Sequence, residues 1–332
     1  MNDTPMLEVR DLHVTFEGHK PLIGGLRGRK PSAAIAVDGI DLAISPGEIV
    51  AIAGESGCGK TTLARTIMGL QASDSGAILL EGATLSMSKQ ALRGHRRRVQ
   101  LVFQDPAGAL DPRQTIYETI AEGIRVQRIP GDEKERVAQA LSHAGLRPPV
   151  AFFERFPHEV SGGQRQRVAI AAALALDPEV LVADEPVSAL DASVKGEILQ
   201  LLLRLREELG LAVVVITHDL GLAWAIADRI AIMYLGRIVE IGPTEEVLSS
   251  PSHPYTEALL SVVPEAGRGK RIILSGEAPD PTRIPAGCRF NPRCPRLAEE
   301  DGQTPLRIRC LGDSPVLHPA GEGHEVACHA AG

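Results

Sequence analysis

The residues best suited to chemistry form a glycine-rich run directly after an apolar stretch, Ile49–Ala53. In order they are Gly54, Glu55, Ser56, Gly57, Cys58, Gly59, Lys60, Thr61 and Thr62. Glycines let backbone N–H groups wrap phosphate oxygens, a lysine at this position reaches the β- and γ-phosphates, and the Thr61 hydroxyl faces Mg²⁺ at the start of the next helix. The run therefore predicts a phosphate-binding loop for a nucleoside triphosphate, placed between a buried strand and a helix.

Two carboxylates end a second apolar stretch, Val180–Asp184. Asp184 is suited to hold Mg²⁺ through water, and Glu185 sits where an attacking water has to be polarised. The alternative is that both acids are ordinary helix caps, since Pro186 follows. Their position downstream of a phosphate loop, on a strand of the same kind, favours the catalytic interpretation.

A second anion site is expected where Ser161, Gly162, Gly163 and Gln164 precede the helical stretch Arg165–Ala175. Ser161 would cap this helix, and the glycines would expose its N-terminal amides. Taken alone, the motif is no more than a capped helix.

Three further polar residues stand at expected strand or helix ends: Gln104, Asp191 and His218. Gln104 lies in Val102-Phe103-Gln104-Asp105-Pro106, Asp191 ends Ser188-Ala189-Leu190-Asp191, and His218 follows the strand Val213–Thr217. Each has a plain structural alternative: a solvated loop amide for Gln104, a helix cap for Asp191 and a structural histidine for His218.

In their order and approximate spacing, these segments resemble the ATP-binding subunit of ABC transporters over residues 7 to about 248. The resemblance implies that Ser161 to Gln164 clasp ATP, that Glu185 is the catalytic base and that His218 contacts the γ-phosphate. It also places Gln104 against both Mg²⁺ and a membrane partner, and Asp191 in a loop that crosses between two chains. One position departs from the family pattern, because Val160 stands where leucine is usual.

The resemblance implies a working unit larger than this chain. Each chain has one phosphate loop and one Ser161–Gln164 segment, and each ATP has to contact both. Two ATPase chains, identical or different, would therefore join head to tail around two ATP molecules. The resemblance also implies two separate transmembrane permease subunits. Other nucleotide-binding classes fit less well, because kinases and GTPases lack the Ser161–Gln164 element. About a hundred residues between Lys60 and Ser161 leave no room for a long inserted coiled coil.

Composition agrees with a soluble, cytoplasmic protein. The net charge is −7, with no basic tail to suggest a nucleic-acid partner. The basic stretch His19–Lys30 is expected to be a solvated surface loop. The beginning of the chain has no charged-then-apolar signal segment, and the longest apolar run, Val168–Leu176, is far shorter than the roughly twenty residues of a membrane span. These features predict that the chain does not cross a bilayer itself, and the resemblance implies a peripheral position on the cytoplasmic face of the cell membrane.

The hydrophobic pattern predicts an α/β fold with the nucleotide at the carboxyl ends of the strands. Expected strands are Leu7–Phe16, Ala36–Ile44, Ile49–Gly54, Ala77–Leu80, Val99–Phe103, Val180–Asp184, Ala212–Thr217, Arg229–Tyr234 and Arg237–Ile241. Residues 105–160 read as an inserted helical subdomain, with helices at Ile116–Arg128 and Asp132–Ala144. By resemblance this insert docks on the membrane subunits. Phe16 is the candidate to stack on adenine, with a core-facing ring as the alternative.

After residue 248 the composition changes to proline, glycine and arginine, which defines an expected C-terminal extension, residues 249–332. It holds four of the five cysteines: Cys288, Cys294, Cys310 and Cys328. In a reducing compartment such thiols favour soft metals or iron–sulfur clusters over disulfides, but the close pairs of a zinc site are absent. Cys58, inside the phosphate loop, is expected to have no metal.

Three segments of this extension resemble that of oligopeptide and dipeptide importer ATPases. They are His253–Thr256, Gly287–Pro295 and Val326–His329. This resemblance implies uptake of di- or oligopeptides delivered by an extracytoplasmic binding protein, although nickel and glutathione importers share the extension. A non-transport ABC ATPase, or an extension that acts as a redox sensor, would also fit the sequence. For the four cysteines, a [4Fe-4S] cluster, zinc and unliganded thiols all remain open.

Overall fold

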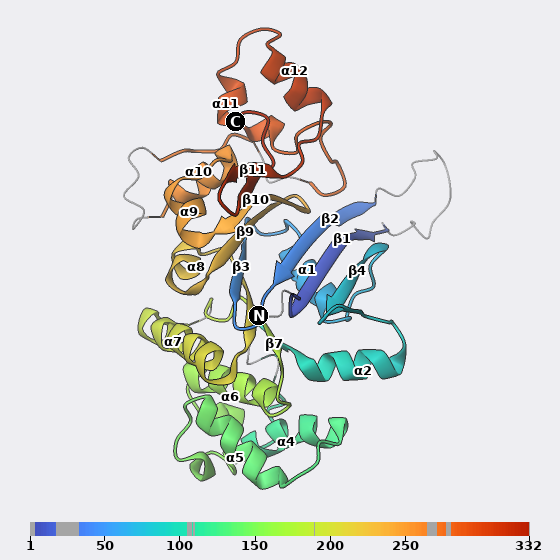
Figure 1. Ribbon diagram of the computed structural model, residues 1–332. Coiled ribbons are helices and arrows are strands. Elements are labelled where there is room, and N and C mark those ends of the chain that lie inside the picture. Colours follow the sequence, from blue (N-terminus) through green and yellow to red (C-terminus); the bar gives the residue numbers. More distant parts are fainter. Residues whose placement is uncertain are drawn as a thin grey trace, which may run out of the picture.

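The computed structural model describes residues 4–17, 33–104, 108, 110–188, 190–263, 271–276 and 280–331. Two sheets occupy its middle, a helical lobe lies at one end and the C-terminal extension at the other (Figure 1). The basic stretch His19–Lys30 lies outside the described residues, as do Asp105, Pro106 and Ala189 of the polar motifs. Nothing in the described part of the chain is a helix long and apolar enough to span a membrane.

The main sheet orders its strands β11-β12-β10-β9-β3-β8-β7-β6 within the described chain. Strands β6, β7, β8, β3 and β9 run parallel, whereas β10, β12 and β11 pair antiparallel at one edge. Every residue of β3, β7 and β8 is buried, which explains why these strands read as continuous apolar runs. The bounds are β3 Ile49–Ala53, β6 Val99–Val102, β7 Val180–Asp184, β8 Ala212–Thr217, β9 Arg229–Tyr234, β10 Arg237–Pro243, β11 His318–Gly321 and β12 His324–Val326.

The second sheet is antiparallel, in the order β2-β1-β4-β5 among the described residues. Its strands are β1 Leu7–Phe16, β2 Ala34–Ile44, β4 Ser75–Leu80 and β5 Ala83–Thr84. Helix α1, Lys60–Ile67, buries Leu63 and Ile67 in one core that this sheet shares with a face of the main sheet. The phosphate loop, which precedes α1, is therefore fixed by packing from two sides.

Helices α6 (Gly162–Leu174), α7 (Ala192–Leu209) and α8 (Leu220–Ile226) cover the other face of the main sheet. Helix α2, Lys89–Arg98, and helix α9, Thr244–Ser249, complete this part of the fold. Short 3₁₀ turns occur at Pro149–Ala151, Pro157–Glu159 and Asn291–Arg293. Sequence analysis did not predict α2, whose strongly basic residues give little apolar signal.

The helical lobe consists of α4, Ile116–Gln127, and α5, Glu133–His143, packed against α6. Each helix begins at a side-chain cap: the Thr115 hydroxyl accepts from the Glu118 N–H, and the Asp132 carboxylate accepts from the Glu135 N–H. The lobe has a hydrophobic core of its own, which includes Ile120, Val137, Leu141, Phe153 and Val168.

The C-terminal extension is joined to the main sheet. It carries α10 (Pro254–Leu260), α11 (Pro295–Ala298) and α12 (Pro305–Gly312), and its strand β12 pairs with β10. Buried Glu240 of β10 accepts from the Ser252 and His253 N–H groups and lies 2.8 Å from His324 Nε2. Sequence analysis predicted neither β11 nor β12, because a strand of three or four residues is too short to show a period.

Candidate nucleotide site

The glycine-rich run forms the connection from β3 to α1, as the sequence predicted. Lys60 is the first residue of α1 and is buried, and its ammonium donates to the carbonyl oxygens of Gly54 and Glu55 at 2.7 and 2.9 Å. These bonds place the positive charge of the lysine inside the loop. An anion at this point would meet both that charge and the N-terminus of α1.

Two glycines of the loop cannot be replaced without moving the backbone. Gly59 has φ 110°, and a Cβ there would come within 2.0 Å of the Ala36 carbonyl oxygen. At Gly54 a Cβ would lie 2.2 Å from the Met233 carbonyl oxygen. The close approach of β2 and β9 to the loop therefore requires glycine at these two positions, whether or not a phosphate is bound.

A cavity of about 560 Å³ opens on this loop at the carboxyl ends of the parallel strands. Its volume lies within the usual range for ligand sites of roughly 300–1,000 Å³. It is lined by candidate site residues from five separate segments of the sequence, together with Pro281 of the C-terminal extension. The lining is Phe16, Ala34, Ala36, Ser56, Gly57, Gly59, Lys60, Thr61, Thr62, Gln104, Glu185, His218 and Pro281.

Glu185 is the centre of a hydrogen-bonded group in this cavity. One of its carboxylate oxygens lies 3.0 Å from His218 Nδ1, and the other accepts from the Gln104 amide at 2.8 Å. Glu185 follows β7 with φ 47°, a left-handed conformation that is uncommon for residues other than glycine. The three side chains come from the ends of β6, β7 and β8, so the strand order of the sheet brings them together.

Asp184 is buried at the end of β7. Burial raises the pKa of its carboxyl group, and a hydrogen bond with Thr61 acts in the opposite direction. Hydroxyl, carboxylate and amide oxygens are ligands that Mg²⁺ accepts. Thr61, Asp184 and the nearby Gln104 therefore fit a magnesium site by their chemistry.

Phe16, at the end of β1, is 42% exposed and lines the cavity. Its ring therefore faces the open site and is not buried in the core, which was the alternative from sequence.

Two segments that were expected to contact ATP, Ser161–Gln164 and the loop with Asp191, do not line the cavity. Ser161 and Gln164 form a reciprocal cap of α6: the serine hydroxyl accepts from the Gln164 N–H at 3.2 Å, and the Ser161 N–H donates to the Gln164 side chain at 3.0 Å. Asp191 stands at the N-cap position of α7 but makes no side-chain bond to that helix. Val160 is buried in the core of the helical lobe, where any apolar side chain of this size would pack.

The four cysteines of the extension line one small cavity of about 10 Å³, together with His253 and His329. Burial raises the pKa of the Cys288 thiol to about 12 and raises the pKa of the other three as well. Over the described ranges, no group of three or more His, Cys, Asp or Glu side chains is arranged to hold a metal ion. The shared cavity shows that the four cysteines lie in the same part of the extension. Their thiols are nevertheless not positioned to hold a metal, so the structure does not support the expected iron–sulfur cluster.

Contacts of the extension with the phosphate loop and with β2 were not predicted. Arg293 forms an ion pair with Glu55, the Tyr255 hydroxyl accepts from the Glu55 N–H, and the Pro281 carbonyl accepts from the Ile35 N–H. The residues of the Glu55 pair are 238 positions apart, and no local pattern joins them.

Two family profiles match the chain. One, described as ABC transporter, matches residues 37–188, and the other, described as the C-terminal region of oligopeptide/dipeptide transporters, matches residues 239–300. A probable peptide ABC transporter ATP-binding protein of Sinorhizobium fredii is 42% identical over 94% of this chain and 87% of its own. The oligopeptide transport protein AppF of Bacillus subtilis is also 42% identical, over 99% and 98% of the two chains. The dipeptide transport protein DppF of Haemophilus influenzae is 40% identical over 98% and 97%.

Solved structures agree with the fold. The subunit cbiO1 of Clostridium perfringens, part of an ABC transporter complex, superposes with a TM-score of 0.64 at 30% identity, covering 75% of this chain and 92% of that one. A dimeric ATP-binding cassette in a post-hydrolysis state with ADP and Pi gives a TM-score of 0.61 at 29% identity, covering 72% and 99%. The expected α/β cassette fold is thereby confirmed.

Proposed function

We infer that this chain, which belongs to the ABC transporter family of ATP-binding proteins, hydrolyses ATP to drive the import of di- and oligopeptides. The observation that carries the ATPase assignment is the single cavity that joins the phosphate loop to Glu185, Gln104 and His218. Peptide cargo is supported by relatives named for peptide, oligopeptide and dipeptide transport at 40–42% identity. These relatives favour peptides over nickel, glutathione or a non-transport role.

In the proposed reaction, Lys60 and the loop N–H groups hold the β- and γ-phosphates, and Glu185 takes a proton from the attacking water. His218, whose Nδ1 lies 3.0 Å from a carboxylate oxygen of Glu185, would orient that carboxylate and contact the γ-phosphate. Thr61, Gln104 and Asp184 would hold Mg²⁺, which neutralises charge on the phosphate oxygens when bound. Phe16, at the mouth of the same cavity, would stack on the adenine.

The proposed working unit contains a second ATPase chain. Ser161 to Gln164 and Asp191 lie outside the cavity of their own chain, so we infer that they act on ATP held by a partner chain. The dimeric cassette among the structural relatives supports this arrangement. Two transmembrane permease subunits would bind the helical lobe, residues 105–160, from the membrane side, and a binding protein would supply the peptide. This chain would then be peripheral, at the cytoplasmic face.

The transport assignment predicts that the full chain, purified gently from membranes of its host, brings two polytopic membrane chains with it. In the reconstituted complex, a peptide-loaded binding protein should raise the ATPase rate, whereas Ni²⁺ or glutathione should not. The Lys60→Ala complex, which should assemble without hydrolysing ATP, is the control. Recovery without any membrane chain would favour a non-transport role. Stimulation by nickel or glutathione alone would contradict the peptide cargo.

We propose that Cys288, Cys294, Cys310 and Cys328, which line one cavity, bind iron or zinc after a rearrangement of their thiols, because their positions in this structure do not form a metal site. A cubane cluster would give anaerobically purified protein a brown colour and about four iron atoms per chain, and zinc would leave it colourless. Cys294→Ser should lose the metal, whereas Cys58→Ser, which changes the cysteine outside the group, should keep it. Metal analysis that finds neither element in the anaerobic wild type would leave unliganded thiols as the answer.

A further inference from the structure

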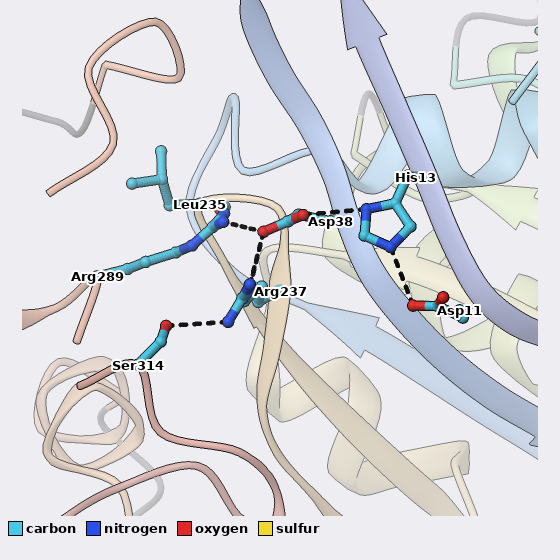
Figure 2. Close-up of polar contacts among 7 residues, drawn as sticks. All are labelled: Asp11, His13, Asp38, Leu235, Arg237, Arg289 and Ser314. Atoms are coloured by element: carbon cyan, nitrogen blue, oxygen red, sulfur yellow. Dashed lines mark hydrogen bonds and ion pairs between the residues drawn. The ribbon is translucent and has the colours of Figure 1, made fainter. Parts of the chain in front are cut away.

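The segment from Cys288 to Cys294 contains two arginines, and both side chains contact the nucleotide-binding part of the chain. Arg289 is buried, hydrogen-bonds the Leu235 carbonyl and pairs with Asp38 of β2. Asp38 also accepts from Arg237 at 2.9 Å and lies 3.0 Å from His13 Nδ1, and Figure 2 shows these side chains converging on it. This group of charges fixes the segment against β2 and β10, independently of the phosphate loop.

The second arginine, Arg293, reaches the phosphate loop itself. Its two terminal nitrogens donate to the two carboxylate oxygens of Glu55 at 2.7 and 3.1 Å, a bidentate pair. The Arg293 side chain is only 10% exposed and its guanidinium lies 6.0 Å from the Tyr234 ring centre, so solvent screens the pair weakly.

Glu55 is also held through its backbone. Its N–H donates to the hydroxyl of Tyr255 at 2.8 Å, and Tyr255 is fully buried, with its ring packed edge-on against Tyr234. The carbonyl of Glu55 accepts from Lys60 at 2.9 Å. The second residue of the phosphate loop thus joins the lysine of the site to two residues of the C-terminal extension.

Because Glu55 is negatively charged, its pairing with Arg293 affects how well the loop can bind ATP. An unpaired carboxylate in the phosphate loop would repel the triphosphate, and at this depth the repulsion would not be fully screened. Arg293 cancels that charge, and Tyr255 fixes the backbone that carries it. We propose that Arg293 and Tyr255 are positioning residues of the ATP site, acting through Glu55, so that the extension sets the ATP affinity of the cassette. The proposal rests on the ATP site alone and is independent of the peptide cargo.

Arg293→Ala is expected to weaken ATP binding about tenfold, the loss that one charge-assisted hydrogen bond can produce. Arg296→Ala is the matched control, because Arg296 pairs with Glu257 inside the extension at 2.6 Å. Tyr255→Phe, which removes only the acceptor of the Glu55 N–H, should raise the KM for ATP several-fold with little change in kcat. Affinity is measured by titration of the full chain with ATP, with Lys60→Ala as the reference for a lost site.

The decisive variant is the double change Glu55→Gln with Arg293→Ala. Once the carboxylate is neutral its partner is no longer needed, so ATP affinity should return to within about threefold of Glu55→Gln alone. If Arg293 served only to fold the extension, the folded double variant would bind ATP as weakly as Arg293→Ala, and the proposal would be wrong. Equal affinity of Arg293→Ala and wild type would also overturn it. Should the alanine variant not fold, Arg293→Gln, which keeps a long polar side chain, undergoes the same comparison.

Discussion

Glu185→Gln is expected to bind ATP as the wild type does and to lose hydrolysis by about 10²- to 10⁴-fold, the usual contribution of a general base. The amide keeps the size of the side chain and can still accept from Gln104, which now donates to the carboxylate at 2.8 Å. It cannot take a proton from water. ATP-bound dimers should therefore accumulate, because the step that reopens them is blocked.

Two measurements check this expectation: single-turnover hydrolysis, and light scattering of the protein with ATP. Glu179→Gln is the matched control, since Glu179 lies just before the other end of β7 and pairs with Arg98 away from the cavity. That variant should hydrolyse ATP normally. A Glu185→Gln rate within a few-fold of wild type would show that another group is the base.

The parts of the site that could be predicted are those in which strand, loop and helix follow each other along the chain. The run into Lys60 and the acids that end β7 combine an apolar strand with chemistry at its end, so both structure and ligand class follow from a short window. His218 shows the limit of this reasoning. Its residue type alone favoured a structural histidine, and only the neighbouring positions of β7 and β8 bring it within 3.0 Å of Glu185.

The parts that could not be predicted depend on pairing between distant segments. β12 pairs with β10 near one edge of the main sheet, with Val326 opposite Glu240, although nothing in the sequence of either segment selects the other as its partner. The Arg293–Glu55 pair is equally hidden, because an arginine between two cysteines and a glutamate in a phosphate loop each have many possible partners. The rings of Tyr255 and Phe290 pack on Tyr234 and hold the extension beside the phosphate loop. That packing exists only in the folded chain.

Ser161→Arg is expected to leave ATP binding intact and to lower hydrolysis by about a hundredfold, the scale set by losing one group that stabilises transition-state charge. Ser161 is exposed at the N-cap of α6 and is absent from the cavity of its own chain, so the large side chain should not disturb ATP bound at Lys60. It should obstruct the approach of this helix end to ATP on the partner chain. Ser161→Ala separates the two effects, because it removes the cap at about 1 kcal/mol without adding bulk.

Mixing Ser161→Arg with Lys60→Ala tests whether ATP sites are shared between chains. In a symmetric dimer each mixed pair holds one intact site, formed by Lys60 of one chain and Ser161 of the other, so about a quarter of all sites should recover. The mixture should then hydrolyse ATP much faster than either variant alone. The chain's ability to form homodimers has to be shown first, by light scattering with ATP; for a heterodimer the second change is made in the partner chain. An inactive mixture of proven dimers would contradict shared sites, and loss of ATP binding by Ser161→Arg alone would mean that this helix end acts within its own chain.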